Sequence, residues 1–359
     1  MGAVLDVARD NKLLRNQYES EIHSDSSEGG SFVISTAKLQ EGVVNLMNNR
    51  RAFLKSSAGL AAALAARPLT GSTQESVAAT LPTVRFGAHE ISRLVVGCNQ
   101  FYGFSHFNQL LDQLMREWNT PERVRDTLRQ CEQNGVNVYQ YSHHGRSFSD
   151  LELHRASGGK MLLIATDTSK DPVEETVKRI RPIALYHHGE RTDVLFRAGK
   201  MDQVQEYTKR LRQTGVLVGI GTHKSEVVEY VEERGWDVDF YLLCAYNRTR
   251  TPEELRKMLG VVPVPPSEVY LETDPPIAYR VARQTQKTCF LFKILAAGRL
   301  TRSPEVIDEA FKTALESIKP KDCVVVGMYP RYKDEVKENS DRVRQILKAS
   351  LGPGLQKAA

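Results

Sequence analysis

The sequence is poor in cysteine and nearly balanced in charge. Its five cysteines are an odd number, spread widely along 359 residues and set mostly in apolar runs. This pattern predicts buried thiols rather than a disulfide framework or a zinc knuckle. The formal net charge is only +5, and the basic residues are interleaved with acidic ones. A basic stripe for a phosphate backbone is therefore missing, and we expect no nucleic-acid partner.

Long apolar runs are also missing. The candidate near the N-terminus is a run of small residues that follows Arg50, Arg51 and Lys55 and ends near Ala66. At about a dozen residues it is shorter than the roughly 20 needed to span a bilayer. Paired arginines, a short apolar region and Ala-x-Ala patterns before Ala66 instead resemble a twin-arginine export signal. A short amphipathic helix or a membrane anchor is the alternative.

The export signal divides the chain into five predicted parts. These are a polar N-terminal extension at residues 1–46 that need not be translated if Met47 is the start, the signal at 47–70, a Ser/Thr/Ala linker at 71–81, a folded domain at 82–350 and a C-terminal tail at 351–359. The twin-arginine route carries proteins that are already folded, often with a bound cofactor. We therefore expect an exported, periplasmic bacterial protein that uses the twin-arginine machinery and keeps no stable membrane span after processing.

Short apolar runs alternate with helical patterns across the folded domain. One helix is predicted from Thr120, a good N-cap, with Pro121 at its first position. The eight apolar runs lie at residues 93–98, 136–141, 160–167, 182–188, 216–223, 237–247, 289–294 and 323–329. Eight strands alternating with helices in about 250 residues predict an α/β fold of the (β/α)8 TIM-barrel type. No Gly-x-Gly-x-x-Gly turn follows the first run, which argues against an open doubly wound sheet.

Catalytic groups of such barrels lie where the strands end. The residues at those positions are Asn99, Gln100, Gln140, Tyr141, His143, His144, Asp167, His187, His188, Thr222, His223, Tyr246, Asn247, Lys293, Gly327, Met328 and Tyr329. Five of the nine histidines fall in this small share of the chain. Imidazole titrates near neutrality and is costly to bury without a partner, so the grouping favours a catalytic role for the set.

The ordered series of strand-end motifs resembles the aldo/keto reductases. "VRFGAHEISRLVVGCNQFYG", "GVNVYQYSHHG", "IALYHHG", "GIGTH", "LAAGRLT" and "VVVGMYPRYKDEVKEN" follow one another from about Val84 to Leu347. That family reduces carbonyls with a nicotinamide cofactor and a tetrad of Asp, Tyr, Lys and His. The resemblance implies a reductase barrel with a small-molecule carbonyl or sugar substrate.

Most of the tetrad is replaced in this chain. Gln140 stands where the family has Asp, His144 where it has Tyr, and Asp167 where it has Lys. A histidine oriented by a carboxylate can also place a proton at a carbonyl oxygen, which makes His144 with Asp167 the predicted acid. The full set of catalytic candidates is His144, Asp167, His188 or its neighbour His187, Gln140, Tyr141 as an alternative phenol and Lys293 as an alternative ammonium.

The resemblance also implies a cofactor site. Arg331 and Lys333 can meet a phosphate, which favours NADP over NAD, and Glu338-Asn339 match the family's adenosine-binding pair. The candidates are Thr222, His223, Asn247, Gly327, Met328, Arg331, Lys333, Glu338 and Asn339. Thr222-His223 replace the family's Ser-Asn, and Leu243 replaces its Gln.

Three functions remain open. The first is an exported aldo/keto reductase-like oxidoreductase that acts on a carbonyl or sugar hydroxyl with bound NADP(H) and a non-standard proton donor. The second is a metal-dependent lyase, isomerase or hydrolase that holds a divalent metal such as zinc with His144, Asp167, His188 and His223. The third is a non-catalytic barrel that binds a carbohydrate or a partner. The loops at 101–119 and 248–267 are expected to shape the pocket.

Overall fold

The computed structural model describes residues 80–166 and 172–350. All described residues belong to one compact unit, which lies within Val77–Ala359. The predicted extension, the export signal, nearly all of the linker, Asp167 and the C-terminal tail lie outside the described residues. No helix in the described ranges is long and apolar enough to cross a membrane.

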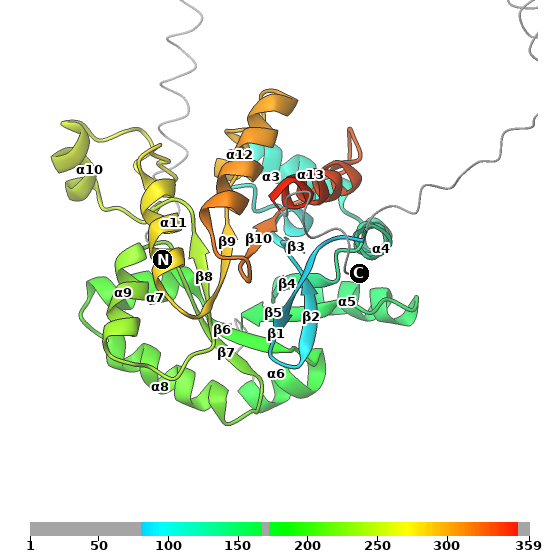
Figure 1. Cartoon of the computed structure of the whole chain (residues 1–359), viewed down its shortest axis with the longest axis horizontal. Coiled ribbons are helices and arrows are strands. Elements are labelled where there is room, and N and C mark those ends of the chain that lie inside the picture. Colours follow the sequence, from blue (N-terminus) through cyan, green and yellow to red (C-terminus); the bar gives the residue numbers. More distant parts are fainter. Residues whose placement is uncertain (1–79, 167–171, 351–359) are drawn as a thin grey trace, which may run out of the picture. The chain divides into compact units, whose positions relative to one another are not determined.

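Eight parallel strands close into a barrel, in the order β10-β3-β4-β5-β6-β7-β8-β9. Figure 1 shows the strands at the centre with helices around them. The strands are β3 (Leu94–Val96), β4 (Val138–Ser142), β5 (Leu162–Thr166), β6 (Ala184–His187), β7 (Leu217–Thr222), β8 (Phe240–Cys244), β9 (Thr288–Phe292) and β10 (Cys323–Val326). The predicted (β/α)8 TIM barrel is confirmed, because each of the eight apolar runs supplies one strand.

Helices lie between the strands and in the two long loops. They are α3 (Gln109–Trp118), α4 (Pro121–Gln133), α5 (Ser147–Ala156), α6 (Val173–Ile180), α7 (Gly189–Arg197), α8 (Met201–Arg212), α9 (Ser225–Glu233), α10 (Pro252–Leu259), α11 (Asp274–Gln284), α12 (Pro304–Ser317) and α13 (Glu335–Ser350), with short 3₁₀ turns η1 (Asn99–Tyr102) and η2 (Ala296–Gly298). Helix α4 begins as predicted, since the Thr120 side chain accepts a hydrogen bond from the Arg123 amide.

A hairpin of β1 (Thr83–Phe86) and β2 (His89–Ser92) packs on the barrel interior. The Phe86 ring lies edge-on to Phe240 at 5.4 Å and to Phe290 at 5.2 Å. Because β2 leads directly into β3, this hairpin covers the end of the barrel where the strands begin. The opposite end, where the strands finish, is left for the site.

Side chains along each strand alternate between the barrel interior and the surrounding helices. On β4, Val138 belongs to the interior cluster, whereas Tyr139 and Tyr141 pack with the outer cluster. All five cysteines are free and buried, which confirms the predicted thiols. Burial raises the pKa of Cys98 to about 11, so this thiol stays protonated near neutrality.

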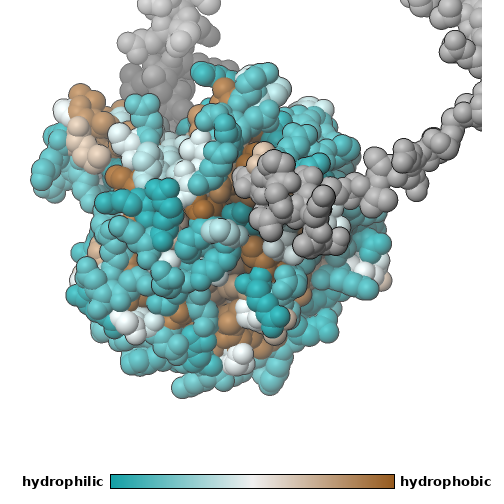
Figure 2. Space-filling view, in the orientation of Figure 1, coloured by the Kyte–Doolittle hydropathy of each residue, from teal (hydrophilic) through white to brown (hydrophobic). Residues whose placement is uncertain are grey.

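The rim carries a patch of exposed apolar side chains around α10. Met258, Val261 and Val264 are exposed there, and Figure 2 shows this end of α10 as a hydrophobic area on a mostly hydrophilic face. The patch belongs to the loop after β8, which the sequence predicts to shape the pocket.

Candidate active site

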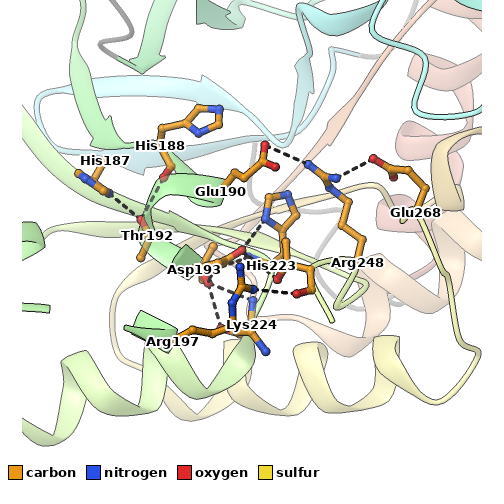
Figure 3. Close-up of polar contacts among 12 residues, drawn as sticks. His187, His188, Glu190, Thr192, Asp193, Arg197, His223, Lys224, Arg248 and Glu268 are labelled. Carbon is orange, nitrogen blue, oxygen red and sulfur yellow. Dashed lines mark hydrogen bonds and ion pairs between the residues drawn. The ribbon is translucent and has the colours of Figure 1, made fainter. Parts of the chain in front are cut away.

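A buried histidine and a buried aspartate form a pair at the mouth of the barrel. His223, directly after β7, has its Nδ1 2.8 Å from Oδ2 of Asp193 on α7. Asp193 is fully buried and also accepts the Thr222 hydroxyl at 2.6 Å and the His223 amide at 3.1 Å. Figure 3 shows Asp193 and His223 directed toward each other. The carboxylate therefore sets the orientation of the ring.

This pair leaves an imidazole that can accept a proton. Because a carboxylate accepts hydrogen bonds, the Nδ1–H of His223 donates to Asp193, and Nε2 carries the lone pair. Burial lowers the pKa of His223 to about 4, although the hydrogen bond and charge of Asp193 oppose this. Nε2 has no hydrogen-bond partner within residues 80–166 and 172–350. The neutral ring packs edge-on against Phe292 at 5.3 Å.

A second carboxylate, that of Glu268, accepts hydrogen bonds from separate loop segments near the pair of His223 and Asp193. Glu268 receives Arg248 Nη1 at 2.6 Å, His106 Nδ1 at 2.8 Å and the Tyr270 hydroxyl at 2.8 Å. Burial alone would raise the pKa of Glu268, but the His106 hydrogen bond and the charges of His106 and Arg248 lower this pKa to about 2. Arg248 also lies 3.7 Å from Glu190, which Figure 3 shows on its other side.

Lys293 directly follows β9 and is within electrostatic range of these groups. Burial and the charges of Arg248 and Arg299 lower the pKa of its ammonium to about 8, opposed by Cys244 and Glu268. The charge of Lys293 in turn helps to lower the pKa of His223. Within the described part of the chain, Nζ of Lys293 has no hydrogen bond and no ion pair. It is thus a desolvated amine near a neutral imidazole.

The backbone around Lys293 is strained. Besides Ala296 at +48° and Ala297 at +51°, three residues with long side chains have left-handed φ values here, +56° at His106, +59° at Glu268 and +62° at Lys293. Non-glycine residues in that conformation cost about 1–3 kcal/mol each and concentrate at functional sites, where the surrounding structure holds them. The loops at the mouth are therefore built to place these three side chains, at a cost in stability.

His187, the last residue of β6, and His188, which follows it, point in different directions, as Figure 3 shows. The Nδ1 of His187 lies 2.7 Å from the Thr192 hydroxyl, and its ring packs on Tyr207 of α8 at 5.2 Å. His187 therefore faces the helices, and strand alternation puts His188 on the interior side. Of the two, His188 is the one at the mouth, where burial lowers its pKa.

These directions predict opposite effects for two adjacent substitutions. His188→Ala is expected to lower turnover at least about tenfold and to change the free energy of unfolding by less than about 0.5 kcal/mol. His187→Ala is expected to lower that free energy by about 1–3 kcal/mol, with turnover per folded molecule unchanged. The buried Thr192 hydroxyl then loses its hydrogen bond with His187 and keeps only the His188 carbonyl as its acceptor. Turnover and denaturant unfolding of both variants check this, and equal turnover losses would contradict it.

The other catalytic candidates are divided between the mouth and the core. The His144 ring lies on the rim, 4.6 Å from Phe104, and burial and His188 lower its pKa. Gln140 is inside the barrel, where Nε2 donates to the Tyr186 hydroxyl at 2.8 Å. Tyr141 faces the helices, with its hydroxyl 3.0 Å from Ser147, so its phenol is not at the mouth. The predicted pairing of His144 with Asp167 involves a residue outside the described ranges.

The cofactor candidates are likewise spread over different environments. Thr222 is fully buried and donates its hydroxyl to Asp193, so its side chain positions the His223 pair and is turned from the mouth. Met328 is fully buried. Glu338 pairs with Lys333 at 3.2 Å, and Asn339 accepts Arg342 at 3.2 Å. The remaining members of the set are Asn247, with a buried Oδ1 that has no partner, and Gly327 and Arg331, which are exposed.

No group of three or more His, Cys, Asp or Glu side chains suited to a metal ion occurs in the described residues. His144, His188 and His223 are not gathered as one ligand set there, and the Nδ1 of His223 is already committed to Asp193. Asp167, the fourth ligand of the metal alternative, is outside those residues.

The sequence analysis missed four residues of this site, namely His106, Glu268, Arg248 and Asp193. Asp193 lies on α7, whose apolar residues Val194, Leu195 and Phe196 are consecutive rather than spaced for a helix. One signal for α7 was present in the sequence. The segment between β6 and α8 is long enough for another helical turn. His106 and Arg248 lie in the two loops predicted to shape the pocket, and Glu268 directly follows the second of these loops, but nothing in the sequence joins them.

No family model matches this chain, and no curated protein does. Among solved structures, a glycerol dehydrogenase, AKR11B4, from Gluconobacter oxydans is 14% identical over 74% of this chain and 95% of its own, with a TM-score of 0.45. A truncated 3-deoxy-D-arabino-heptulosonate 7-phosphate synthase from Thermotoga maritima is 13% identical over 76% and 92%, with a TM-score of 0.44. A phosphoribosyl anthranilate isomerase from Thermus thermophilus is 12% identical over 71% and 99%, with a TM-score of 0.39. Similarities this distant support no conclusion about activity. The barrel is assigned from the pairing of its own strands.

Proposed function

We propose that this barrel is an oxidoreductase that interconverts a sugar-type hydroxyl and a carbonyl with bound NADP(H). The observation that carries the proposal is the pair of His223 and Asp193, which holds a neutral imidazole with a partner-free Nε2 at the strand ends. Oxidation of an alcohol needs a base for the hydroxyl proton, and a histidine oriented by a carboxylate is suited to this step. The aldo/keto reductase resemblance of the sequence supports the same reaction class.

The phosphate end of the proposed cofactor site carries cationic hydrogen-bond donors that suit the phosphate groups of NADP. Arg331 and Lys333 are exposed cations just before α13. At Gly327 a side chain would come within 2.9 Å of Gln100 Oε1, a buried oxygen without a hydrogen-bond partner in the described residues. The glycine thus keeps open a space beside an unpaired polar atom. We propose that Gly327, Arg331 and Lys333 hold the phosphate and adenosine end.

The chain's own residues supply the proton chemistry. When bound, NADP⁺ is a hydride acceptor and NADPH a hydride donor. His223 takes the hydroxyl proton on Nε2, and Asp193 stabilises the resulting imidazolium; in the reverse direction the same nitrogen returns the proton to the carbonyl oxygen. His188 and His144 lie at the mouth as further groups that can orient the substrate.

The predicted export signal completes the proposal. An exported oxidoreductase has no supply of reduced cofactor from the cytoplasm, and the twin-arginine route carries folded proteins with their cofactors. We therefore propose that the protein is exported to the periplasm by the twin-arginine machinery with NADP(H) already bound, and that the cofactor is recycled in place by the substrate pair.

The full chain, expressed with its own export signal and purified from the periplasm, tests the proposal. We expect native mass spectrometry to find one NADP(H) per chain, an N-terminus created by cleavage near Ala66, and absorbance changes at the nicotinamide band with a panel of sugars and hydroxyketones. A stoichiometric divalent metal without nicotinamide would support the metal-dependent alternative instead. Tight sugar binding with neither group would support the non-catalytic barrel.

A further inference from the structure

We propose that Lys293 is a nucleophilic amine that forms an imine with the carbonyl of a hydroxyketone bound at the barrel mouth. The inference rests on the proposed function only in requiring a carbonyl compound at the same mouth. It adds a covalent step that hydride transfer does not need.

The first support is the position of Lys293. It is the residue directly after β9, where a barrel presents its reacting groups. Its φ of +62° is a conformation that a lysine adopts only when held there. The neighbouring β9 residue, Phe292, packs against the His223 ring. The charge of Lys293 helps to lower the pKa of His223, so the amine lies within electrostatic range of this imidazole.

The second support is that no carboxylate of residues 80–166 and 172–350 pairs with Lys293. The Glu268 carboxylate, whose charge acts on Lys293, is already occupied by Arg248, His106 and Tyr270. Arg299 stacks on the Tyr270 ring at 4.2 Å and donates to the His106 carbonyl at 3.0 Å. Lys293 therefore lies near two arginines, Arg248 and Arg299, and none of the described residues pairs with its Nζ. Two other lysines are held differently, since Lys224 pairs with Glu254 and Lys319 with Asp322.

The third support is the chemical state of the amine. Burial and neighbouring Arg248 and Arg299 lower the pKa of Lys293 to about 8, opposed by Cys244 and Glu268. His223 and His106 are titratable groups near this site, and the charge of Lys293 lowers the pKa of both. At pH 7 the free-amine fraction is then on the order of 100-fold larger than for an ordinary lysine. Lysines activated by desolvation and a nearby cation are known nucleophiles toward carbonyls.

The step balances without an oxidant or reductant. The lone pair of Nζ forms a C–N bond to the carbonyl carbon while the carbonyl oxygen takes up a proton. The amine proton is lost, and the oxygen leaves as water, which gives the C=N bond; a protonated imine follows by protonation of the nitrogen. One hydroxyketone and one amine thus give one imine and one water. The imine makes the adjacent C–H more acidic, and the neutral His223 is positioned as the base for that proton.

Borohydride trapping tests the inference on the full chain. The protein is incubated at pH 7 with dihydroxyacetone and sodium cyanoborohydride, without added NADP(H), and analysed by intact mass and peptide mapping. We expect one reduced adduct per chain on Lys293, formed at least about tenfold faster than on Lys224 or Lys319. The rate of adduct formation should rise with pH, with a midpoint near the pKa of about 8.

Two variants sharpen the result. Lys293→Arg keeps the positive charge but cannot form an imine, and Lys293→Met removes both the charge and the amine. Each variant is expected to lose the adduct. If a variant fails to fold, the map of the unsubstituted chain still decides the site. Modification spread over exposed lysines, or absent from Lys293, would overturn the inference. These outcomes can be told apart from those of the proposed function. An adduct on Lys293 without NADP-linked turnover would contradict only the oxidoreductase proposal, and turnover without an adduct would contradict only the imine proposal.

Discussion

His223→Gln is expected to lower turnover by about 10²–10⁴-fold, the range typical for removal of a general acid or base. Glutamine retains a polar group at the buried position but cannot take up the substrate proton. The matched control is His187→Gln, which alters a buried histidine of the same barrel whose ring faces α8 rather than the mouth. Turnover of both variants with the best hydroxyl or carbonyl substrate is the measurement.

The same residue makes a prediction about pH. Burial depresses the pKa of His223 to about 4, below its ordinary value of 6.5, and His187 is depressed to about 4 as well. Between these values the unfolded chain binds more protons than the folded one, so the free energy of unfolding falls as pH decreases from about 6.5 to about 4.

Turnover per folded molecule should persist below pH 6.5, because His223 stays neutral. Loss of turnover with a midpoint near 6.5 would show that His223 is not the base.

Asp274→Ala is expected to lower the free energy of unfolding by about 3–5 kcal/mol. Asp274, at the start of α11, is buried and holds the buried guanidinium of Arg250, with Nη1 at 3.0 Å from Oδ2 and a second contact from Nη2. Removal of the carboxylate leaves an uncompensated buried charge. Arg250 also donates to the Asn247 carbonyl, so the loop after β8 should loosen together with α11.

A surface pair provides the comparison. Asp237 pairs with Arg212 at 3.0 Å, but its side chain is 83% exposed. Asp237→Ala is expected to change the free energy of unfolding by less than about 1 kcal/mol, because water screens such pairs. Urea unfolding of both variants measures the two values, and a similar loss for each would mean that the Arg250 pair contributes no more than a surface contact.

The residues at the strand ends show which part of the site could be predicted from the sequence. His188, His223 and Lys293 were all located at the mouth from their places after apolar runs, because strand length and barrel type fix where a parallel strand finishes. The partner of His223 was not found, because Asp193 lies on helix α7, which no local period indicates. Glu268, which binds Arg248 and His106, lies in an irregular loop and was not found either. The choice between His187 and His188 also needed the register of β6, because adjacent strand residues face opposite sides.

The sequence by itself determined the eight strands, their alternation with helices and the ring of polar residues at their ends, because these features follow from local apolar patterns and short-range turn signals. Only the tertiary structure decided that Thr222 supports Asp193, that Tyr141 faces the helices and that Lys293 has no counter-ion among the described residues. These properties depend on contacts between segments far apart in the chain, and on the burial that removes water from them. A pKa of about 8 for Lys293 or about 4 for His223 is a result of that burial.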